Sequence, residues 1–456
     1  MTKYKPTRIS EFLKEREGRY NPADPEILNL QRLNKIDFKG EIHLSDKSSK
    51  TNMIVIEPGD LVISGINVSK GAIAVYHGEC PIVATIHYSS YKFDEEKIEI
   101  EYFKRFLKSQ SFVESLKEQV KGGIKTEIKP KHFLPLEVCL PDICSQKEIV
   151  SFFSRIENDM SDLRNEIEQQ QEYLKKLRQA ILQEAIEGKL TADWRKKNPD
   201  LISGENHALK LLETIKLEKD KLVKEGKIKK SKPLDPVTDD EKPFNLPGGW
   251  GWCRPVELGM FSGGGTPSTH IKEYWNGDVP WITPKDMKVD NIVASKINIT
   301  EKGIQNSNTT FLPVNTLIFV VRSGILKHTI PISLTKVPAT INQDLKSWTL
   351  FVPEMASFLQ INIKGNEGRL LREVIKKGMT VESFDFDKFK TCLLPLTSIA
   401  EQSAIVERVD KLMTMVDELE KQVTERKEQS EMLMKSVLKE AFEGKTSVSH
   451  EKVGAL

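Results

Sequence analysis

A long stretch of this sequence occurs twice in the same chain. Residues 146–189 align without a gap on residues 402–445, which lie 256 positions later, and ILQEAIEGK in the first copy matches VLKEAFEGK in the second. The match extends upstream, where residues 58–63 face residues 313–318 at an offset of 255. Solenoid repeats are about 20–50 residues long, so this spacing indicates a duplicated unit in which a globular domain precedes a helix.

Both copies of the repeat carry apolar residues at alternating steps of four and three. A period of 3.5 residues sustained over about six heptads is typical of a coiled coil. A 44-residue helix is about 66 Å long, which is longer than one domain of about 150 residues covers, so packing on its own domain is the weaker interpretation. We expect the helix-pair interface at Ile149, Phe153, Ile156, Met160, Leu163, Ile167, Leu174, Leu177 and Ile181 in the first copy, and at Ile405, Val409, Leu412, Val416, Leu419, Val423, Leu433 and Val437 in the second.

The repeat predicts a five-part chain. Strand-like Val/Ile runs and helix-like segments in each globular part predict mixed α/β (α+β) domains, joined to long α-helices. Because a whole domain separates the two helices, we expect an antiparallel two-helix coiled coil with a globular domain at each end and a pseudo-twofold internal repeat. The expected parts are globular domain 1 (1–144), helical region 1 (145–200), a charged linker with a short helix (201–243), globular domain 2 (244–398) and helical region 2 (399–456).

Composition excludes several classes of protein. Lys and Arg total 68 and Asp and Glu 66, so the net charge of +2 rules out a globally basic coat. There is no run of about 18 apolar residues and no apolar leader, so we expect neither secretion nor membrane spanning. The five cysteines form no CxxC pair, which favours reduced thiols in the cytosol over a structural zinc site. The lysine-rich residues 219–232 are a solvated linker face or, less favoured, a contact to a DNA backbone.

The usual motifs of catalysis are missing. FSGGGTPS (261–268) matches neither a dinucleotide fingerprint nor a P-loop, so a turn that presents Thr266 and Ser268 is favoured over a phosphate cradle. Gly444-Lys445-Thr446 resembles the end of a P-loop, but Lys439 stands where the first glycine belongs; the repeat counterpart Gly188 indicates a helix C-cap. The eight histidines show no ligand spacing. We therefore expect no catalytic residue and no metal site.

Several motifs, in this order on a duplicated frame, resemble type I restriction–modification specificity (S) subunits. They are LRQAILQEAIEGKLTADWR after the first helix, NLPGGWGW and GGGTPSTHIKEYWNGDVPWI at the start of domain 2, and Leu394-Pro395-Leu396 leading into Ile399-Ala400-Glu401-Gln402. The first domain departs from the family by beginning near Arg8-Ile9-Ser10-Glu11-Phe12 without an LPxGW opening, so it is either trimmed or of a different recognition subtype.

The resemblance implies a non-catalytic, cytoplasmic, prokaryotic subunit. Its two globular parts would be target-recognition domains that each read half of a bipartite double-stranded DNA target, while the helices set the spacer and dock the methyltransferase. It also implies two methyltransferase (M) subunits and two restriction/translocase (R) subunits, with S-adenosylmethionine, ATP and Mg bound by those partners and no cofactor bound by this chain.

Base reading requires polar side chains that reach base edges. For each candidate, the alternative is an exposed loop residue away from DNA, and Asn342 and Gln343 are alternatively framework hydrogen-bonders. The candidates in domain 1 are Asn67, Ser69, Lys70, Ser89, Tyr91, Lys92, Lys121 and Lys125, and those in domain 2 are Thr266, Ser268, Lys285, Arg322, Ser323, Lys327, His328 and Lys346.

A rod of about 66 Å limits the distance between two half-sites to about 19 base pairs at ~3.4 Å per pair. We expect an insertion within residues 174–181, with a matching change near Leu433, to alter the spacer and neither half-site. Two other functions remain open. An antiparallel scaffold with protein-binding ends would show no sequence-dependent DNA binding, and a free-standing nuclease or methylase would need the motifs that are missing.

Overall fold

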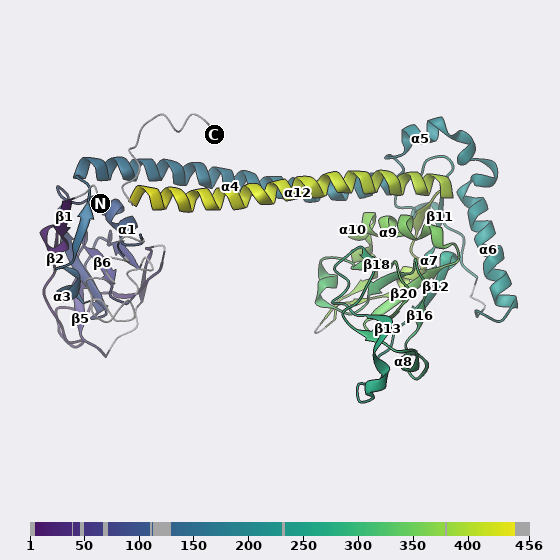
Figure 1. Ribbon diagram of the computed structural model, residues 1–456, viewed down its shortest axis with the longest axis horizontal. Coiled ribbons are helices and arrows are strands. Elements are labelled where there is room, and N and C mark those ends of the chain that lie inside the picture. The colour runs from purple at the N-terminus through teal and green to yellow at the C-terminus, as the bar shows by residue number, and fades with distance from the viewer. Residues whose placement is uncertain are drawn as a thin grey trace. The chain divides into compact units, whose positions relative to one another are not determined.

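The computed structural model of the chain describes residues 5–38, 40–45, 50–66, 72–109, 112, 129–229, 233–378 and 381–442. The chain divides into two compact units, one made of residues 1–169 with 423–456 and the other of residues 170–422. Each unit contains one sheet-rich domain and a part of both long helices (Figure 1). The domain boundaries expected from the sequence stay a prediction.

Two four-stranded sheets form the domain of the first unit. All neighbouring strands are antiparallel except β3 and β8, which are parallel. One sheet has the order β2 (Leu13–Glu15), β9 (Tyr88–Phe93), β6 (Leu61–Ser64) and β7 (Ile73–Val75), and the other has the order β4 (Ile42–Ser45), β3 (Arg32–Ile36), β8 (Ile82–Thr85) and β5 (Met53–Ile56). A separate pair joins β1 (Lys5–Arg8) to β10 (Glu137–Leu140), and the helices are α1 (Ile100–Phe106) and α3 (Pro130–Phe133).

An aromatic cluster holds this domain to the first long helix. Phe103, Phe112 and Phe133 are fully buried in one core, and Ile149 and Phe153 from the beginning of that helix belong to the same core. Deleting such a buried aromatic ring typically costs about 3–5 kcal/mol. The helix therefore begins as a part of the domain rather than as a free extension.

The domain of the second unit is built from a five-stranded and a four-stranded sheet. The first has the order β12 (Gly259–Gly263), β20 (Leu345–Leu350), β17 (Leu317–Val320), β18 (Ile332–Thr335) and β14 (Asn291–Ile292). The second has the order β15 (Asn298–Ile299), β13 (Trp275–Ile282), β19 (Ala339–Ile341) and β16 (Phe311–Leu312). Apolar side chains of both sheets, including Ile282, Ile318 and Ile341, form the core between them.

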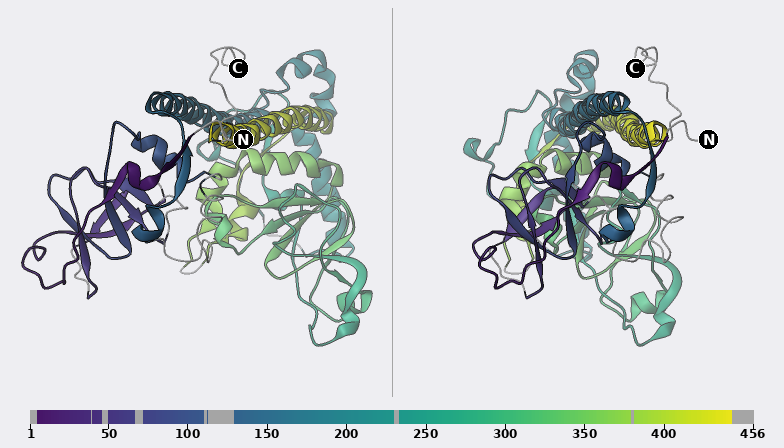
Figure 2. Two further views of the ribbon diagram at one scale, coloured as in Figure 1. Left: turned by 60° about the vertical axis from the view of Figure 1, so that its left-hand side comes forward. Right: turned by 90° about the vertical axis from the view of Figure 1, so that its left-hand side faces the viewer.

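Shorter elements complete the second domain. Helix α9 contacts β18 on one side, and on the other Gly365 packs against Leu182 and Ile186 of the first long helix (Figure 1). Helix α8 with its flanking loops extends from the four-stranded sheet (Figures 1 and 2). The helices are α7 (Pro255–Leu258), α8 (Glu301–Gln305), α9 (Ala356–Gly365), α10 (Glu367–Val374) and α11 (Phe386–Thr391); the strand pairs are β11 (Gly251–Cys253) with β23 (Leu394–Leu396) and β21 (Ile375–Lys376) with β22 (Ser383–Phe384).

The two domains share one strand order. The order β2-β9-β6-β7 in the first corresponds to β12-β20-β17-β18 in the second, and β4-β3-β8-β5 corresponds to β15-β13-β19-β16. The turn before β6 contains Gly59 (φ +85°), and the turn before β17 contains Asn315 (φ +62°). Asn is one of the few residues besides Gly that adopts positive φ readily. This equivalence corrects the expected offset of 255 at this turn to 256.

Two helices of 44 residues each, α4 (Ile143–Ile186) and α12 (Ile399–Phe442), run alongside each other (Figures 1 and 2). In the first unit, Ser430 contacts Met160. In the second, Arg178 binds Asp417 at 2.5 Å and Glu420 at 3.0 Å. Within the second unit Arg178 lies beside Asp417, whereas Leu190, which follows α4, accepts a hydrogen bond from Arg408 at 2.6 Å, so the chains of the two helices run in opposite directions.

In each long helix, one of the two expected apolar rows is largely buried, whereas the other row is buried only at its first position, which is Ile149 in α4 and Ile405 in α12. In α4 the row Phe153, Ile167, Leu174 and Ile181 is buried, and in α12 the row Val409, Val416 and Val423 is buried. The expectation that Leu177, Leu419 and Leu433 are enclosed in the interface is wrong, since their exposed fractions are 43%, 44% and 45%. Two helices alone do not cover both rows, so the second row lies at the flank. The side chain of Val437 lies outside the described residues.

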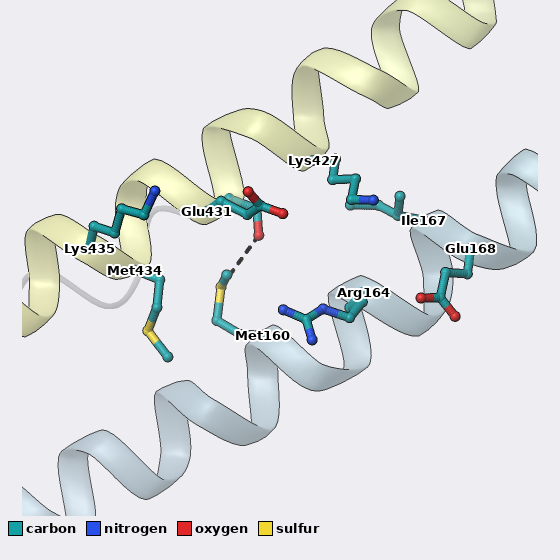
Figure 3. A pocket seen from close by; sticks show the side chains of 9 residues that line it. Met160, Arg164, Ile167, Glu168, Lys427, Glu431, Met434 and Lys435 are labelled. Carbon is teal, nitrogen blue, oxygen red and sulfur yellow. Dashed lines mark hydrogen bonds between the residues drawn. The ribbon is translucent and has the colours of Figure 1, made fainter. Parts of the chain in front are cut away.

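A groove of about 470 Å³ interrupts the helix contact in the first unit (Figure 3). It lies where Ser430 replaces an apolar residue in the buried row of α12, and its hydroxyl contacts the sulfur of Met160 at 3.7 Å. Its lining combines apolar stems with charges of both signs, from Met160, Arg164, Ile167, Glu168, Lys427, Ser430, Glu431, Met434 and Lys435. The polar interruption therefore leaves the two helices incompletely packed at this level.

After α4 the chain turns and enters the linker. Gly188 has φ +69° and its N–H donates to the carbonyl of Ala185, as in a helix C-cap. Gly444, for which the same cap is expected, lies outside the described residues. The linker contains α5 (Ala192–Lys197) and α6 (Ala208–Lys224). At the start of the lysine-rich stretch, Lys219 donates to the carbonyl of Val256, so this lysine packs on domain 2; residues 230–232 lie outside the described part.

The remaining expectations concern membranes and thiols. Within the described ranges, no helix is long and apolar enough to cross a membrane. The described cysteines, Cys80, Cys139, Cys144, Cys253 and Cys392, are thiols and not halves of a disulfide. Burial raises the pKa of the Cys392 thiol to about 12 and also raises that of Cys253.

Candidate nucleic-acid interface

The loops that carry the candidate base readers of domain 2 meet at one edge of its sheets. In the five-stranded sheet Gly263 of β12 lies opposite Lys346 of β20, and Val320 of β17 lies opposite Leu345 of β20. The end of β12, the end of β17 and the start of β20 are therefore neighbours. The parallel partner strands β13 and β19 also end here, because the N–H of Asn342 donates to the carbonyl of Ile282 at 3.0 Å. We call residues 264–268, 283–286, 321–331 and 342–346 the loop edge.

All eight candidates of domain 2 lie on the loop edge, although they are up to 80 residues apart in the sequence. Thr266, Lys285, Arg322 and Lys327 are exposed, as are Ser268 and His328. This gathers three of the cationic side chains with hydroxyl and imidazole groups, which is the mixture that phosphate and base contacts require. Whether each of them touches DNA stays a prediction.

Two candidates on the loop edge also have structural partners. The Ser323 hydroxyl accepts a hydrogen bond from the N–H of Ile325 and begins a short 3₁₀ helix, Gly324–Lys327. The Nζ of Lys346 lies 4.8 Å from the centre of the Phe386 ring, within the range of a cation–π contact. These contacts restrict where the two side chains point, whereas Lys285 and Lys327 project from the loops.

The glycine-rich stretch forms a closely packed turn, as the sequence analysis favoured. The N–H of Gly265 donates to Ile341 at 3.0 Å, and its carbonyl accepts from the Trp281 indole at 2.9 Å and from the Thr309 hydroxyl at 2.7 Å. A Cβ on Gly264 would lie 2.1 Å from the carbonyl oxygen of Asn342. The glycines are therefore needed for backbone-to-backbone approach, and they position Thr266 beside the 342–344 turn.

The 342–344 turn gives different surroundings to Asn342 and Gln343, for both of which the sequence left a framework role open. Asn342 is 6% exposed, and its side chain binds the N–H of Asp344 at 3.2 Å and its carboxylate at 3.3 Å. This is a framework role. Gln343 is exposed, and its Oε1 accepts a hydrogen bond from the Thr266 hydroxyl. Sequence reasoning did not select Gln343 as a reader because the partner that orients it is 77 residues away.

In domain 1 only three of the eight candidates are described. Asn67, Ser69, Lys70, Lys121 and Lys125 lie outside the described residues. Ser89 and Tyr91 are 9% and 1% exposed, and the Tyr91 ring packs 5.9 Å from that of Phe133. The structure does not support either as a base reader, because alternate residues of β9 face the core. Lys92 is exposed and lies opposite Lys14 of β2.

The buried carboxylate of Asp60 explains why β9 carries a polar residue that faces the protein interior. Asp60 is 2% exposed and accepts hydrogen bonds from the Ser90 hydroxyl at 2.7 Å and from the Arg16 guanidinium at 2.5 and 2.7 Å. The hydrogen bond that Arg16 donates to Asp60 raises the pKa of Arg16. The serine pair Ser262 and Ser347 joins the corresponding strands of domain 2, with oxygens 2.6 Å apart. Polar residues on β9 therefore stabilise the sheet.

One histidine lies in a group of side chains that could hold a metal ion, although the histidines are scattered in the sequence. Ligand atoms of Asp37, Glu41 and His43 lie within 4.8 Å of one another. His43 Nε2 is 3.2 Å from Asp37, whose other oxygen accepts from the N–H of Glu41 at 2.9 Å. These contacts account for the cluster as a part of the β3–β4 hairpin.

Domain 2 is joined to the long helices through Glu401, near the beginning of α12. Glu401 is fully buried and accepts hydrogen bonds from four side chains of three separate segments. Thr191 donates at 2.7 Å and Arg195 at 2.5 Å to one oxygen, while Trp250 donates at 2.8 Å and Thr397 at 2.7 Å to the other. Arg195 and Trp250 thereby link α5 and the start of domain 2 to α12.

The position equivalent to Glu401 in the first half of the chain carries a different contact. The repeat places Ser145 where Glu401 stands, and its hydroxyl donates to exposed Asp142 at 2.8 Å. The next residue keeps its role in both halves, since Gln146 donates to Pro141 and Gln402 donates to Thr397, each at 2.8 Å. The side-chain Oε1 of Gln146 also accepts a hydrogen bond from the backbone N–H of Glu99 at 2.8 Å.

Comparison with known proteins matches these features. Residues 247–429 match the type I restriction modification DNA specificity domain. Over 169 residues, which are 37% of this chain and 42% of the relative, the chain is 38% identical to the Escherichia coli type I restriction enzyme EcoR124I/EcoR124II specificity subunit. It is also 29% identical over 199 residues, 42% of the chain and 43% of the relative, to the MjaIX specificity subunit of Methanocaldococcus jannaschii. These matches cover less than half of each relative.

The fold matches across nearly the whole chain. The HsdS subunit from Thermoanaerobacter tengcongensis superposes with a TM-score of 0.56 at 15% identity, covering 97% of both chains. The resemblance to type I specificity subunits that the sequence motifs indicated is confirmed, and so is a mixed α/β fold with long helices.

Proposed function

From the type I restriction modification DNA specificity domain at residues 247–429, we infer that this chain is the DNA specificity subunit of a type I restriction–modification complex. Each sheet-rich domain reads one half of a bipartite double-stranded target. The observation that carries this proposal is the loop edge of domain 2. It gathers exposed polar and cationic side chains from four separate loops, whereas strands β12, β17 and β20 provide a rigid frame behind them.

The long helices act as the spacer element. The contacts of Met160 with Ser430 and of Arg178 with Asp417 support an antiparallel two-helix coiled coil, and the shared strand order of the domains supports a pseudo-twofold repeat. A 44-residue helix is about 66 Å long. Half-sites that are read from its two ends are at most about 19 base pairs apart.

The flanks of the helices dock the partner subunits. Tyr173 and Leu177 of α4 are 64% and 43% exposed, and Met415 and Leu419 of α12 are 56% and 44% exposed. Exposed apolar residues that recur along a helix commonly mark protein interfaces. Two methyltransferase subunits bind here, and two restriction subunits join the full complex. S-adenosylmethionine, ATP and Mg belong to those partners, so this chain selects the sequence and performs no catalysis.

Methylation mapping tests the proposal. The full chain is co-expressed with its methyltransferase partner, and the modified bases of the host genome are sequenced. The expected result is one motif with two specified halves and a gap of fixed length. Methylation without a bipartite motif, or none that depends on this chain, contradicts the proposal and favours a scaffold with protein-binding ends.

A charge substitution separates DNA binding from target choice. Lys327→Ala removes an exposed cation from the loop edge, and if that cation contacts a phosphate the slope of log affinity against log salt falls by about 1, with an unchanged motif. Lys336→Ala is the matched control, because Lys336 follows the opposite end of β18. Equal effects of the two substitutions on the salt slope would show that the loop edge does not face DNA.

A further inference from the structure

We propose that Gln343, oriented by Thr266, is a base-reading side chain of domain 2 and that it recognises an adenine in the major groove. The inference rests on the proposed function and deepens it, because it assigns one residue pair to one base of one half-site. It is carried by the contact between the glycine-rich turn and the 342–344 turn.

The backbone that carries Gln343 is held from several directions. The N–H of Asn342 donates to Ile282 at 3.0 Å, and the N–H of Leu345 donates to Asn342 at 3.2 Å. The Asn342 side chain binds Asp344, and the Asp344 carbonyl accepts from Val321 at 3.0 Å. Gln343 therefore lies at the tip of a short turn whose neighbours on both sides are fixed.

The glycine-rich turn that carries Thr266 is also held by hydrogen bonds. The N–H of Gly265 donates to Ile341, and its carbonyl accepts from Trp281 and Thr309. The backbone next to Thr266 is therefore held in place. Its hydroxyl donates to Oε1 of Gln343. This bond holds the end of the Gln343 side chain beside Thr266, with the amide oxygen as the acceptor.

The side-chain amide of Gln343 still has donors and an acceptor available for hydrogen bonds. Oε1 accepts one hydrogen bond and retains a second lone pair, and among the residues that the structure describes no hydrogen-bond acceptor is recorded for the Nε2 group of Gln343. One remaining acceptor beside two free donors is the pattern that pairs with N6–H and N7 of adenine in the major groove. Holding the amide in this orientation before binding reduces the entropy that is lost on recognition.

A purely structural role for the pair fits the geometry less well. Both side chains are exposed, so their mutual hydrogen bond competes with water and adds little to stability. The turns are already closed by the backbone contacts of Gly265 and Asn342. The Thr266–Gln343 bond therefore controls where the amide points rather than whether the loops form.

The test compares methylation motifs. The wild-type chain, Gln343→Ala, Thr266→Val and the control Glu354→Ala are each expressed with the methyltransferase partner, and modified sites are mapped. Glu354 is exposed and follows the opposite end of β20, so it leaves the loop edge intact. Gln343→Ala is expected to relax one adenine position of one half-site, with a loss of discrimination of roughly 5- to 150-fold at that position. Thr266→Val relaxes the same position to a smaller extent, and Glu354→Ala retains the wild-type motif.

The outcomes distinguish this inference from the function on which it rests. A wild-type chain that yields no bipartite motif overturns both. A bipartite motif that Gln343→Ala leaves unchanged overturns only the inference, as does relaxation at a base other than adenine. If Gln343→Ala reduces methylation at all sites equally, with no change of motif, the residue is structural. Urea unfolding of Gln343→Ala shows whether the folded state is retained.

Discussion

Glu401 offers the sharpest test of how domain 2 is joined to the helices. It is a fully buried carboxylate with four donors, of which only Arg195 carries a charge. Glu401→Ala leaves Thr191, Trp250 and Thr397 without their acceptor. An unsatisfied buried polar group costs about 1–3 kcal/mol, and breaking a buried ion pair costs about 3–5 kcal/mol in total. Because these contributions overlap, we expect the free energy of unfolding to fall by about 3–5 kcal/mol.

A second ion pair on the same elements provides the matched control. Arg408 of α12 binds Asp193 of α5 at 2.5 and 2.8 Å, but the Asp193 side chain is 59% exposed. Exposed pairs contribute little, since water and salt compete with them. Asp193→Asn is therefore expected to change stability by only a small fraction of the Glu401→Ala effect, although both substitutions break one contact between α5 and α12.

Urea unfolding of the full chain, followed by tryptophan fluorescence, measures both variants. Five of the six tryptophans lie between residues 250 and 348, so the signal reports mainly on domain 2, and Trp250 reports on the joint itself. Comparable losses for Glu401→Ala and Asp193→Asn would refute the argument from burial. A loss below about 1 kcal/mol for Glu401→Ala would show that the joint does not hold the domain.

Three further predictions follow from the helices and the thiols. Inserting seven residues within both 174–181 and 413–420 adds about 10 Å to the helix pair. This insertion is expected to lengthen the spacer in the methylation motif by about 3 base pairs and to leave both half-sites unchanged. Altered half-sites with an unchanged spacer would refute the idea that helix length sets the spacer. Ser430→Leu fills the groove beside Met160 and is expected to stabilise the helix pair by about 1 kcal/mol, seen as slower amide hydrogen exchange at residues 423–436; faster exchange there would mean that the groove is not free to be filled. At pH 8 a thiol reagent is expected to modify exposed Cys80 and Cys144 but neither Cys253 nor Cys392 in the folded chain, because their raised pKa leaves little thiolate, whereas all five react in urea; rapid labelling of Cys392 at that pH would contradict its burial.

The helix contacts also correct where the matching insertion belongs. The sequence placed it near Leu433, but Arg178 contacts Asp417 and Glu420. The heptad pattern predicted the two helices and their length because 3.5-residue periodicity depends on local spacing alone. It gave only a partial signal for which apolar row is buried, because Gln170 and Arg426 interrupt the largely exposed row but Ser430 interrupts the buried one, and the choice depends on the partner. Leu177 and Leu419 were misplaced for this reason.

At the candidate site, too, local sequence patterns indicated residue types but not which residues come together in the fold. The residue types of Thr266, Arg322 and Lys327 indicated polar loops, and their gathering at one edge follows from strand order, which the sequence did not reveal. Tyr91 resembled a surface aromatic because Ser89, Ser90 and Lys92 surround it. The buried Asp60 that satisfies Ser90 is 30 residues away, so no local pattern could have placed β9 in the core. Gln343 was left open because its orienting partner is equally remote.

The joint at Glu401 also affects how recognition modules are exchanged between chains. A foreign second domain must supply an indole, or another donor, at the place of Trp250, since otherwise a buried carboxylate loses one of its four partners. The first domain needs no such donor at Ser145, the counterpart of Glu401, because the Ser145 hydroxyl binds exposed Asp142 instead. At this position, therefore, the first module can be exchanged with fewer compensating changes, and chimeras of the second retain function most readily when the crossover lies after Trp250.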